Sequence, residues 1–182
     1  DLFYQRGNEL TTYSAQLFST WTNDFETEAK LGYLEVENGQ KSFTTDPGFG
    51  EFRINDVNGY DIHFGADEFR QSNVLNYETF SAKLAGNYYY GDHTITGGFE
   101  YEATDVFNLF NPGAEGLFVF EGLDNFEQGI ADEITYRIPG SLDTNDSAAE
   151  FTFETTTLYV QDKWYVTTDL SLTFGLRYDK WD

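Results

Sequence analysis

The chain has 182 residues, with 32 acidic and 10 basic side chains that give a formal net charge of −22. This charge argues against a nucleic-acid partner, because phosphate neutralisation needs clustered Lys and Arg. Aromatic residues make up 19% of the chain, which argues against disorder. The chain lacks cysteine, which excludes disulfides, thiolate zinc sites and cysteine nucleophiles.

Apolar and polar side chains alternate along much of the chain, which is the two-residue period of a β-strand with unlike faces. Six segments show this period: Leu10–Thr22, Phe25–Val36, Val74–Tyr90, His93–Val106, Glu150–Val166 and Leu170–Asp179. They are about 10 to 17 residues long, whereas strands of soluble proteins average roughly 5–6. A tilted strand needs about 9–11 residues to cross a bilayer.

The connections between these segments alternate in length. Two or three residues follow the first, third and fifth segments, whereas the second and fourth are followed by Glu37–Asn73 and Phe107–Ala149. Short turns at one end and long loops at the other are typical of an outer-membrane barrel. We therefore predict an all-β fold, an antiparallel up-and-down transmembrane β-barrel segment with two long external loops. A soluble antiparallel sheet with one solvated face is the alternative.

The aromatic residues support the membrane interpretation, because large rings flank all three short turns, as an interfacial girdle requires. These are Trp21 and Phe25, then Tyr88–Tyr90, then Trp164 and Tyr165. We expect the apolar face, which includes Leu172, Phe174 and Leu176, to meet lipid. The opposite face, with Ser171, Thr173 and Arg177, is expected to line a wet lumen, and so are Glu26, Glu28, Lys30, Lys83, Thr96, Glu100 and Glu102.

The second long loop is strongly acidic and includes a predicted helix. Residues 105–150 contain ten acidic residues and one basic residue, Arg137. The stretch Leu123–Ile130 is expected to form a short helix that Asp124 caps and Gly129 ends.

The sequence shows little sign of catalytic or metal chemistry. His63 and His93 lack metal-ligand spacing, and we expect His93 to be an exposed residue at a turn. The stretches Asn55–Asp61 and Asp143–Asp146 are rich in oxygen ligands without the spacing of an EF-hand, so surface calcium is the only metal considered. No other cofactor is expected. An enzyme activity is not expected either, because acid/base catalysis needs a pocket, unequal environments and a held substrate, whereas lumenal carboxylates of barrels normally pair with neighbours or with a plug.

The last 25 residues resemble a strand pair of TonB-dependent outer-membrane receptors. The resemblance is carried by Tyr159-Val160-Gln161-Asp162 with Trp164, and by Leu170, Leu172 and the run Gly175–Asp179. The segments FGADEFRQSN, FSAKLAGNYYYGDHTITGGFEYE and DVFNLFN resemble the branch of large receptors with an N-terminal carboxypeptidase-regulatory-like domain.

The resemblance implies a 22-stranded barrel that holds a plug domain and imports a scarce ligand with energy passed through TonB. Residues 1–182 would form about six strands of one barrel domain, cut from a longer chain, with no counterpart of the plug or the TonB box. The implied partners are the TonB energy-transducing complex, outer-membrane lipid and a small ligand, glycan or peptide. The implied location is the outer membrane of a Gram-negative bacterium.

Two other functions remain open from the sequence. One is a passive porin or structural outer-membrane barrel, and the other is a secreted carbohydrate- or surface-binding β-sandwich. For a receptor, the candidate ligand-binding residues lie in the lumen and in the external loops: Lys83, Glu100, Glu102, Phe126 and Arg137.

Overall fold

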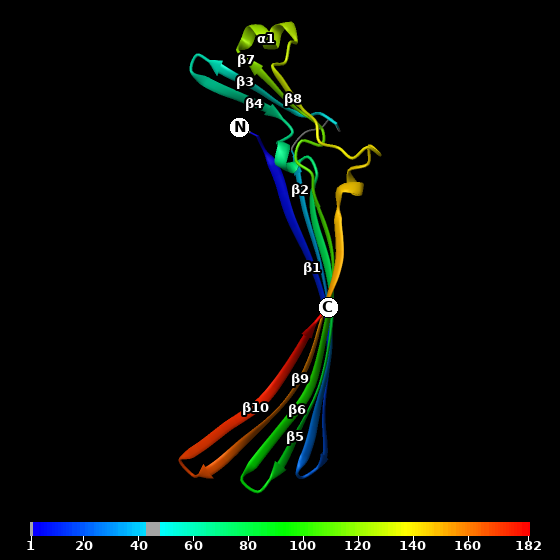
Figure 1. Ribbon diagram of the computed structural model, residues 1–182, viewed down its shortest axis with the longest axis vertical. Coiled ribbons are helices and arrows are strands. Elements are labelled where there is room, and N and C mark those ends of the chain that lie inside the picture. The colour runs from blue at the N-terminus through cyan, green and yellow to red at the C-terminus, as the bar shows by residue number, and fades with distance from the viewer. Residues whose placement is uncertain (1, 43–47) are drawn as a thin grey trace. The chain divides into compact units, whose positions relative to one another are not determined.

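The computed structural model describes residues 2–42 and 48–182. Six long strands form an antiparallel sheet in which sequence neighbours pair, in the order β1-β2-β5-β6-β9-β10 (Figure 1). This up-and-down arrangement confirms the predicted fold class. The strands are β1 (Tyr4–Thr22), β2 (Phe25–Ser42), β5 (Asn73–Tyr90), β6 (His93–Phe110), β9 (Ala149–Thr167) and β10 (Leu170–Trp181).

The chain divides into two compact units. The first, called the loop unit here, comprises residues 1–9, 36–76 and 106–150, and the second, the strand unit, comprises residues 10–35, 77–105 and 151–182. Strands β1, β2, β5, β6 and β9 contribute residues to both units.

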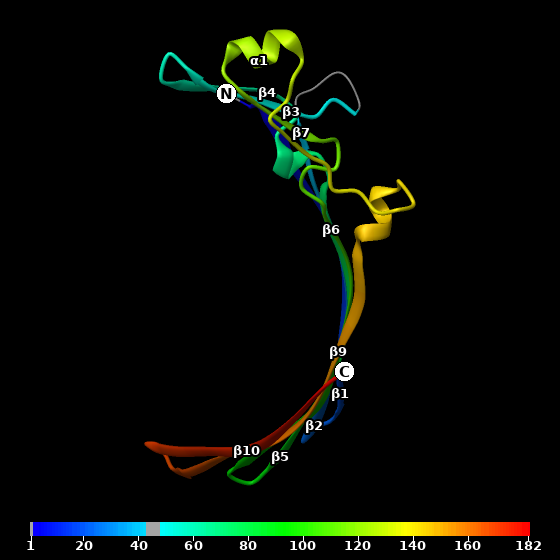
Figure 2. The same cartoon turned by 45° about the horizontal axis from the view of Figure 1, so that its top comes forward.

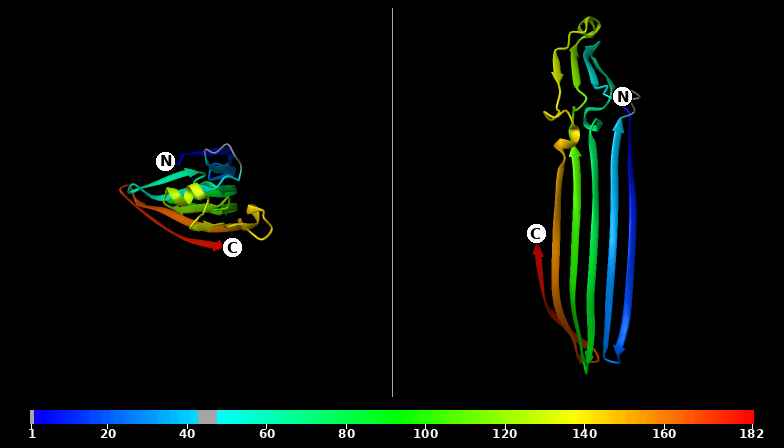
Figure 3. Two further views of the ribbon diagram at one scale, coloured as in Figure 1. Left: turned by 90° about the horizontal axis from the view of Figure 1, so that it is seen from above. Right: turned by 90° about the vertical axis from the view of Figure 1, so that its right-hand side faces the viewer.

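In the strand unit, tight turns join the strands into three hairpins (Figure 3). The turns fall at Asn23-Asp24, Gly91-Asp92 and Thr168-Asp169, as predicted. Gly91 has a φ of 57°, a left-handed conformation that glycine adopts without a steric penalty. The short connections are therefore set by local turn chemistry.

The register between β9 and β10 separates two unlike faces. Leu172 pairs with Trp164, and Leu176 pairs with Val160, so apolar side chains gather on one face. Arg177 pairs with Tyr159 on the opposite face. Leu176 is 79% exposed in this sheet. The faces predicted for the final strand are therefore those of the structure.

The other strands continue both faces. On the apolar face, the ring centroids of Tyr13 and Tyr33 lie 6.5 Å apart, and the Phe80 and Tyr101 rings are equally close. On the polar face, Lys83 in β5 forms an ion pair with Glu28 in the neighbouring strand β2.

The loop unit contains a second sheet that the sequence analysis did not predict. Its strands are β3 (Glu51–Val57), β4 (Tyr60–Gly65), β7 (Leu117–Glu121) and β8 (Glu133–Thr135), in the order β4-β3-β7-β8. The central pair, β3 and β7, is parallel and joins the two segments that were expected to be long loops. A parallel pair between distant segments leaves no local turn signal.

Two stretches of the loop unit differ from their sequence-based interpretation. The acidic stretch Asn55–Asp61 forms the β3–β4 hairpin, with Asn58 at φ 54° and Gly59 at φ 80°. Two successive positive φ angles at Asn-Gly are typical of a type I′ turn. The stretch Asp143–Asp146 enters a 3₁₀ turn at Thr144–Ser147, and Asp143 caps this turn by accepting the Asn145 amide.

The predicted helix is present as α1 (Leu123–Gln128), which lies beside the loop sheet (Figure 2). Gly129 ends the helix in the left-handed conformation, as predicted. The predicted cap is wrong, because Gly122 occupies the N-cap position and Asp124 lies within the first turn. In the described ranges, no helix combines the length and apolar character needed to cross a membrane.

One glycine on the polar face of the strand unit permits close packing. A Cβ atom on Gly98 would lie 2.4 Å from the Tyr159 ring, so this ring covers Gly98 directly. An aromatic ring laid over a strand glycine supports the pairing that the glycine weakens.

We predict that Gly98→Ala costs about 1–3 kcal/mol in the unfolding free energy of the full-length protein, because the added methyl displaces the Tyr159 ring. In a Tyr159→Ala background, the same substitution should cost much less. Urea unfolding in detergent micelles measures the four variants of this cycle. Equal costs in both backgrounds would show that the ring does not occupy this space.

Candidate functional site

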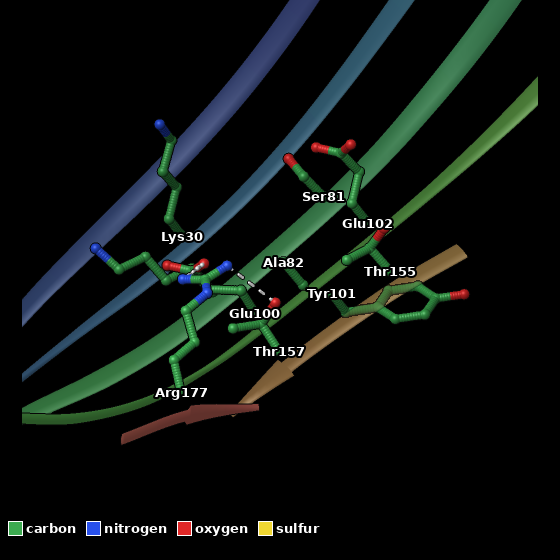
Figure 4. A pocket seen from close by; sticks show the side chains of 10 residues that line it. Lys30, Ser81, Ala82, Glu100, Tyr101, Glu102, Thr155, Thr157 and Arg177 are labelled. Atoms are coloured by element: carbon green, nitrogen blue, oxygen red, sulfur yellow. Dashed lines mark hydrogen bonds and ion pairs between the residues drawn. The ribbon is translucent and has the colours of Figure 1, made fainter. Parts of the chain in front are cut away.

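The strand unit contains a polar hollow with a volume of about 380 Å³. Five strands contribute to it, and Figure 4 shows nearly all of its side chains labelled in place. It is lined by Lys30, Ser81, Ala82, Lys83, Glu100, Tyr101, Glu102, Thr155, Thr157 and Arg177. Apart from Ala82 and Tyr101, which have the opposite parity, these residues follow the two-residue period, because side chains of the same parity on neighbouring strands meet on one face.

Opposite charges alternate across this polar face. Lys83 Nζ lies 2.8 Å from Glu28 Oε2, and Arg177 Nη1 lies 3.7 Å from Glu100 Oε2. Arg177 also approaches Asp179, with 2.9 Å between Nη2 and Oδ1, and donates to Thr157 Oγ1 at 3.2 Å. These ion pairs and hydrogen bonds make the face polar and wettable.

Three of the predicted ligand-binding residues, Lys83, Glu100 and Glu102, are brought together in this hollow. The sequence analysis placed Arg177 on the lumenal face but did not include it among the ligand-binding residues. Thr157 was missed as well, although it is only 2% exposed. Strand parity was the available signal, because both residues fall on the polar face of their strands.

The loop unit is organised around a buried carboxylate, Glu51, which is 1% exposed. Its Oε1 lies 2.6 Å from Arg53 Nε and 3.2 Å from His63 Nδ1. Its Oε2 accepts the backbone N–H of Glu68 at 2.7 Å. Arg53 Nη2 also lies 2.7 Å from Glu68 Oε2, so the two glutamates share one guanidinium.

Arg137, another predicted ligand-binding residue, extends this ionic cluster. Its Nη1 lies 3.4 Å from Glu68 Oε1 and donates to the Pro112 carbonyl at 3.3 Å. Arg137 therefore ties the segment after β8 to the segment before β7. This contact assigns Arg137 a structural role within the loop unit, whatever it does with a ligand.

The pKa of Glu51 follows from opposing effects. Burial raises the pKa, but hydrogen bonds from Arg53 and from the Glu68 amide, with the charge of Arg53, outweigh burial and lower it below the ordinary value. Glu51 in turn raises the pKa of Arg53 through its hydrogen bond. Glu51 and Arg53 are therefore both ionised at neutral pH.

The opposite face of the loop sheet is aromatic. Phe52 in β3 stacks between Phe64 in β4 and Phe118 in β7, with ring centroids 5.3 and 4.9 Å apart. Phe126, the remaining predicted ligand-binding residue, meets Phe64 and Phe120 edge-on from α1, at 5.7 and 5.2 Å. Phe126 thus anchors the helix on the sheet. The five predicted residues belong to two units, three in the strand unit and two in the loop unit.

His93 is not simply an exposed turn residue. It is the first residue of β6, and its Nδ1 lies 2.7 Å from Asp162 Oδ2 while its ring stacks on Trp164 at 5.5 Å. For metals, residues 2–42 and 48–182 contain no group of three or more His, Asp or Glu side chains placed to hold an ion.

Comparison with known proteins agrees with this geometry. Residues 8–182 match the family model described as "Outer membrane beta barrel domain", so the chain belongs to this family. The location predicted from the sequence, the outer membrane, is thereby confirmed. In the structure, the apolar face of the strand unit is accordingly its lipid-facing side.

Among solved structures, the chain resembles the outer membrane transporter YddB from Escherichia coli, with a TM-score of 0.58 and 14% sequence identity. The match covers 96% of this chain and 22% of that one, so the chain spans about a fifth of the transporter's length. No sequence among curated proteins matches this chain.

We predict that Glu51→Leu destabilises the loop unit by about 3 kcal/mol, because it leaves the partly buried Arg53 with one carboxylate fewer and removes the acceptor of the Glu68 amide. Hydrogen exchange of β3 and β7 amides in the full-length protein measures this local stability. Glu133→Gln, at an exposed position in the same sheet, is the control and should leave exchange unchanged.

The pKa of Glu51 adds a pH dependence. Its lowered value in the folded state means that the stabilisation is present above pH 4.5, the ordinary value, and is lost as pH falls through the folded value. Protection factors, which correct the exchange rates for the pH dependence of intrinsic amide exchange, should therefore fall in acid in the native protein and change less in Glu51→Leu. Identical acid sensitivity in both proteins would contradict this assignment.

Proposed function

We propose that this chain is a barrel segment of a TonB-dependent outer-membrane receptor, which binds a scarce ligand at its external loops and imports it through a plugged barrel. The observation that carries the proposal is the match of this six-stranded segment to 22% of an outer membrane transporter. A barrel several times larger than the segment has room for a plug, whereas small barrels fill their interior with side chains.

The open edges of the sheet support a large barrel. Strands β1 and β10 each have one neighbour in the described sheet. Unpaired backbone groups cost several kcal/mol each in hydrocarbon, so further strands must pair with both edges in the membrane. The 22-stranded barrel implied by the sequence resemblance supplies such strands.

The polar face suits a wall around a plug. Its charges are paired within the wall, as in Lys83–Glu28 and Arg177–Glu100, and its hollow carries threonine hydroxyls and carboxylates. Such a surface can exchange hydrogen bonds with a polar domain that moves during transport. A passive porin could have the same wall. The presence or absence of a plug domain therefore distinguishes a receptor from a porin.

The folded loop unit favours a receptor. Its sheet, its ionic cluster and α1 hold the loop residues in a defined arrangement. Loops that are ordered before binding lose less conformational entropy when a ligand arrives. A passive pore gains nothing from this ordering.

Single-molecule conductance of the full-length protein tests this proposal. A plugged receptor should leave a planar lipid bilayer without steady ion-conducting steps and should retain the purified periplasmic domain of TonB in a pull-down. The same protein with its sequence upstream of the barrel deleted is the control and should conduct. Steady conductance by the intact protein, together with no retention of TonB, would identify a passive porin instead.

A further inference from the structure

The loop sheet presents an aromatic strip, defined here as Phe49, Phe52, Phe64, Phe118, Ile134 and Tyr136. The cross-strand register places Phe64, Phe52, Phe118 and Ile134 in one row across four strands. Phe49 stacks on Phe52 with 5.1 Å between centroids, and the Tyr136 ring, like that of Phe118, packs on Gly116.

One half of this face is covered and the other half is open. Under α1, Ile54 and Phe120 are 3% and 5% exposed. At the other half, Ile134 is 62% exposed, Tyr136 57% and Phe49 36%. Exposed apolar rows of this kind mark binding surfaces on folded proteins.

Negative charge surrounds the strip. The helix α1 carries exposed Asp124 and Glu127, and exposed Asp132 lies just before β8. Glu115, next to Gly116, is partly desolvated, and burial raises the pKa of its carboxyl despite a hydrogen bond from the Gly48 amide. A cation placed beside Glu115 would favour the charged form of this carboxyl and so offset the effect of its burial.

The arginines of residues 48–72 and 111–148 are engaged elsewhere. Arg53 and Arg137 lie in the ionic cluster on Glu51 and Glu68, and Arg70 lies over the Tyr4 ring at 4.6 Å. The acidic side chains around the strip are thus left without a described cationic partner, and their field selects a positively charged occupant.

We propose that the aromatic strip binds a cationic peptide segment whose apolar side chains lie on the row of rings. A bare metal ion does not use an apolar row that crosses four strands, and an anionic ligand meets the field of the surrounding carboxylates. A second copy of this chain carries the same charge of −22 and is repelled. This inference rests on the proposed function, since it names the ligand class that the external loops capture.

Binding by the full-length receptor in lipid nanodiscs tests the inference, with a fluorescently labelled Lys-Phe-Lys-Phe-Lys peptide amide as the probe. Fluorescence anisotropy should show saturable binding that weakens as salt is raised, because surface charge interactions are screened. The Glu-Phe-Glu-Phe-Glu and Lys-Ser-Lys-Ser-Lys peptides should not bind, because each lacks one of the two required features.

Two substitutions on the receptor locate the site. Ile134→Ser with Tyr136→Ser removes exposed parts of the strip without touching the ionic cluster, and it should weaken binding about tenfold or more. Leu142→Ser is the matched control, because Leu142 is 74% exposed, lies outside the strip and should leave affinity unchanged. Hydrogen exchange of β3 and β7 checks that the double variant retains the loop sheet.

The outcomes separate this inference from the proposed function. Absence of probe binding, or equal affinity in the double variant and the Leu142→Ser control, overturns the peptide site even if the receptor is plugged and retains TonB. If the native receptor forms dimers and the double variant does not, the strip binds a second copy of the chain, and the peptide site is again overturned. Binding localised to the strip in a protein that conducts freely would support the site and contradict the receptor.

Discussion

The structure depends on one constraint, that a backbone amide or carbonyl in hydrocarbon must find its hydrogen-bond partner within the protein. Six strands of 12 to 19 residues satisfy it by pairing with their sequence neighbours along their length. The tight turns follow, because a turn at the membrane boundary reverses the chain with few exposed groups. The chain's membership of an outer-membrane barrel family agrees with this pattern of paired strands and tight turns.

The same pairing produces the functional surfaces. Once neighbouring strands are in register, successive side chains of a strand lie on opposite faces of the sheet. Positions that face lipid therefore need apolar side chains, and the positions between them need polar ones. Leu176 and Val160 meet on one face, and Arg177 and Tyr159 meet on the other, although the pairs are adjacent in sequence. The polar hollow around Lys83 and Glu100 is a product of this alternation across five strands.

The sequence predicted what is local or periodic. The six strands, the turns at Asn23-Asp24 and Gly91-Asp92, and the left-handed end of α1 at Gly129 each leave a signal within a few residues. Within the loop sheet, only the Asn58-Gly59 turn between β3 and β4 leaves such a signal, and it was not used. The rest of this sheet leaves none, because β3 pairs in parallel with a strand more than fifty residues away, and its strands are only three to seven residues long. The contacts of Glu51 were unpredictable for the same reason, because the Glu68 amide reaches Glu51, and Arg137 reaches Glu68, only through this fold.

The predicted site residues also differ in whether a periodic pattern or only the fold determines their contacts. Glu100, Glu102 and Lys83 were predicted together because strand parity is periodic, and the structure gathers them in one hollow. Phe126 and Arg137 were chosen by residue type within an acidic loop, and their contacts hold the loop unit together. Residue type alone does not distinguish a ligand contact from a packing contact, whereas the aromatic strip emerges only when four short strands are aligned.

Spin labels placed singly at residues 171–178 of β10, in the full-length protein in liposomes, test the central claim most directly. Collision rates with oxygen, which partitions into lipid, and with a water-soluble nickel chelate should both vary with a period of two residues and in opposite phase. Oxygen maxima are expected at Leu172, Phe174 and Leu176, and nickel maxima at Ser171, Thr173 and Arg177. In-phase profiles, or nickel access at every position, would contradict a strand with one face in lipid.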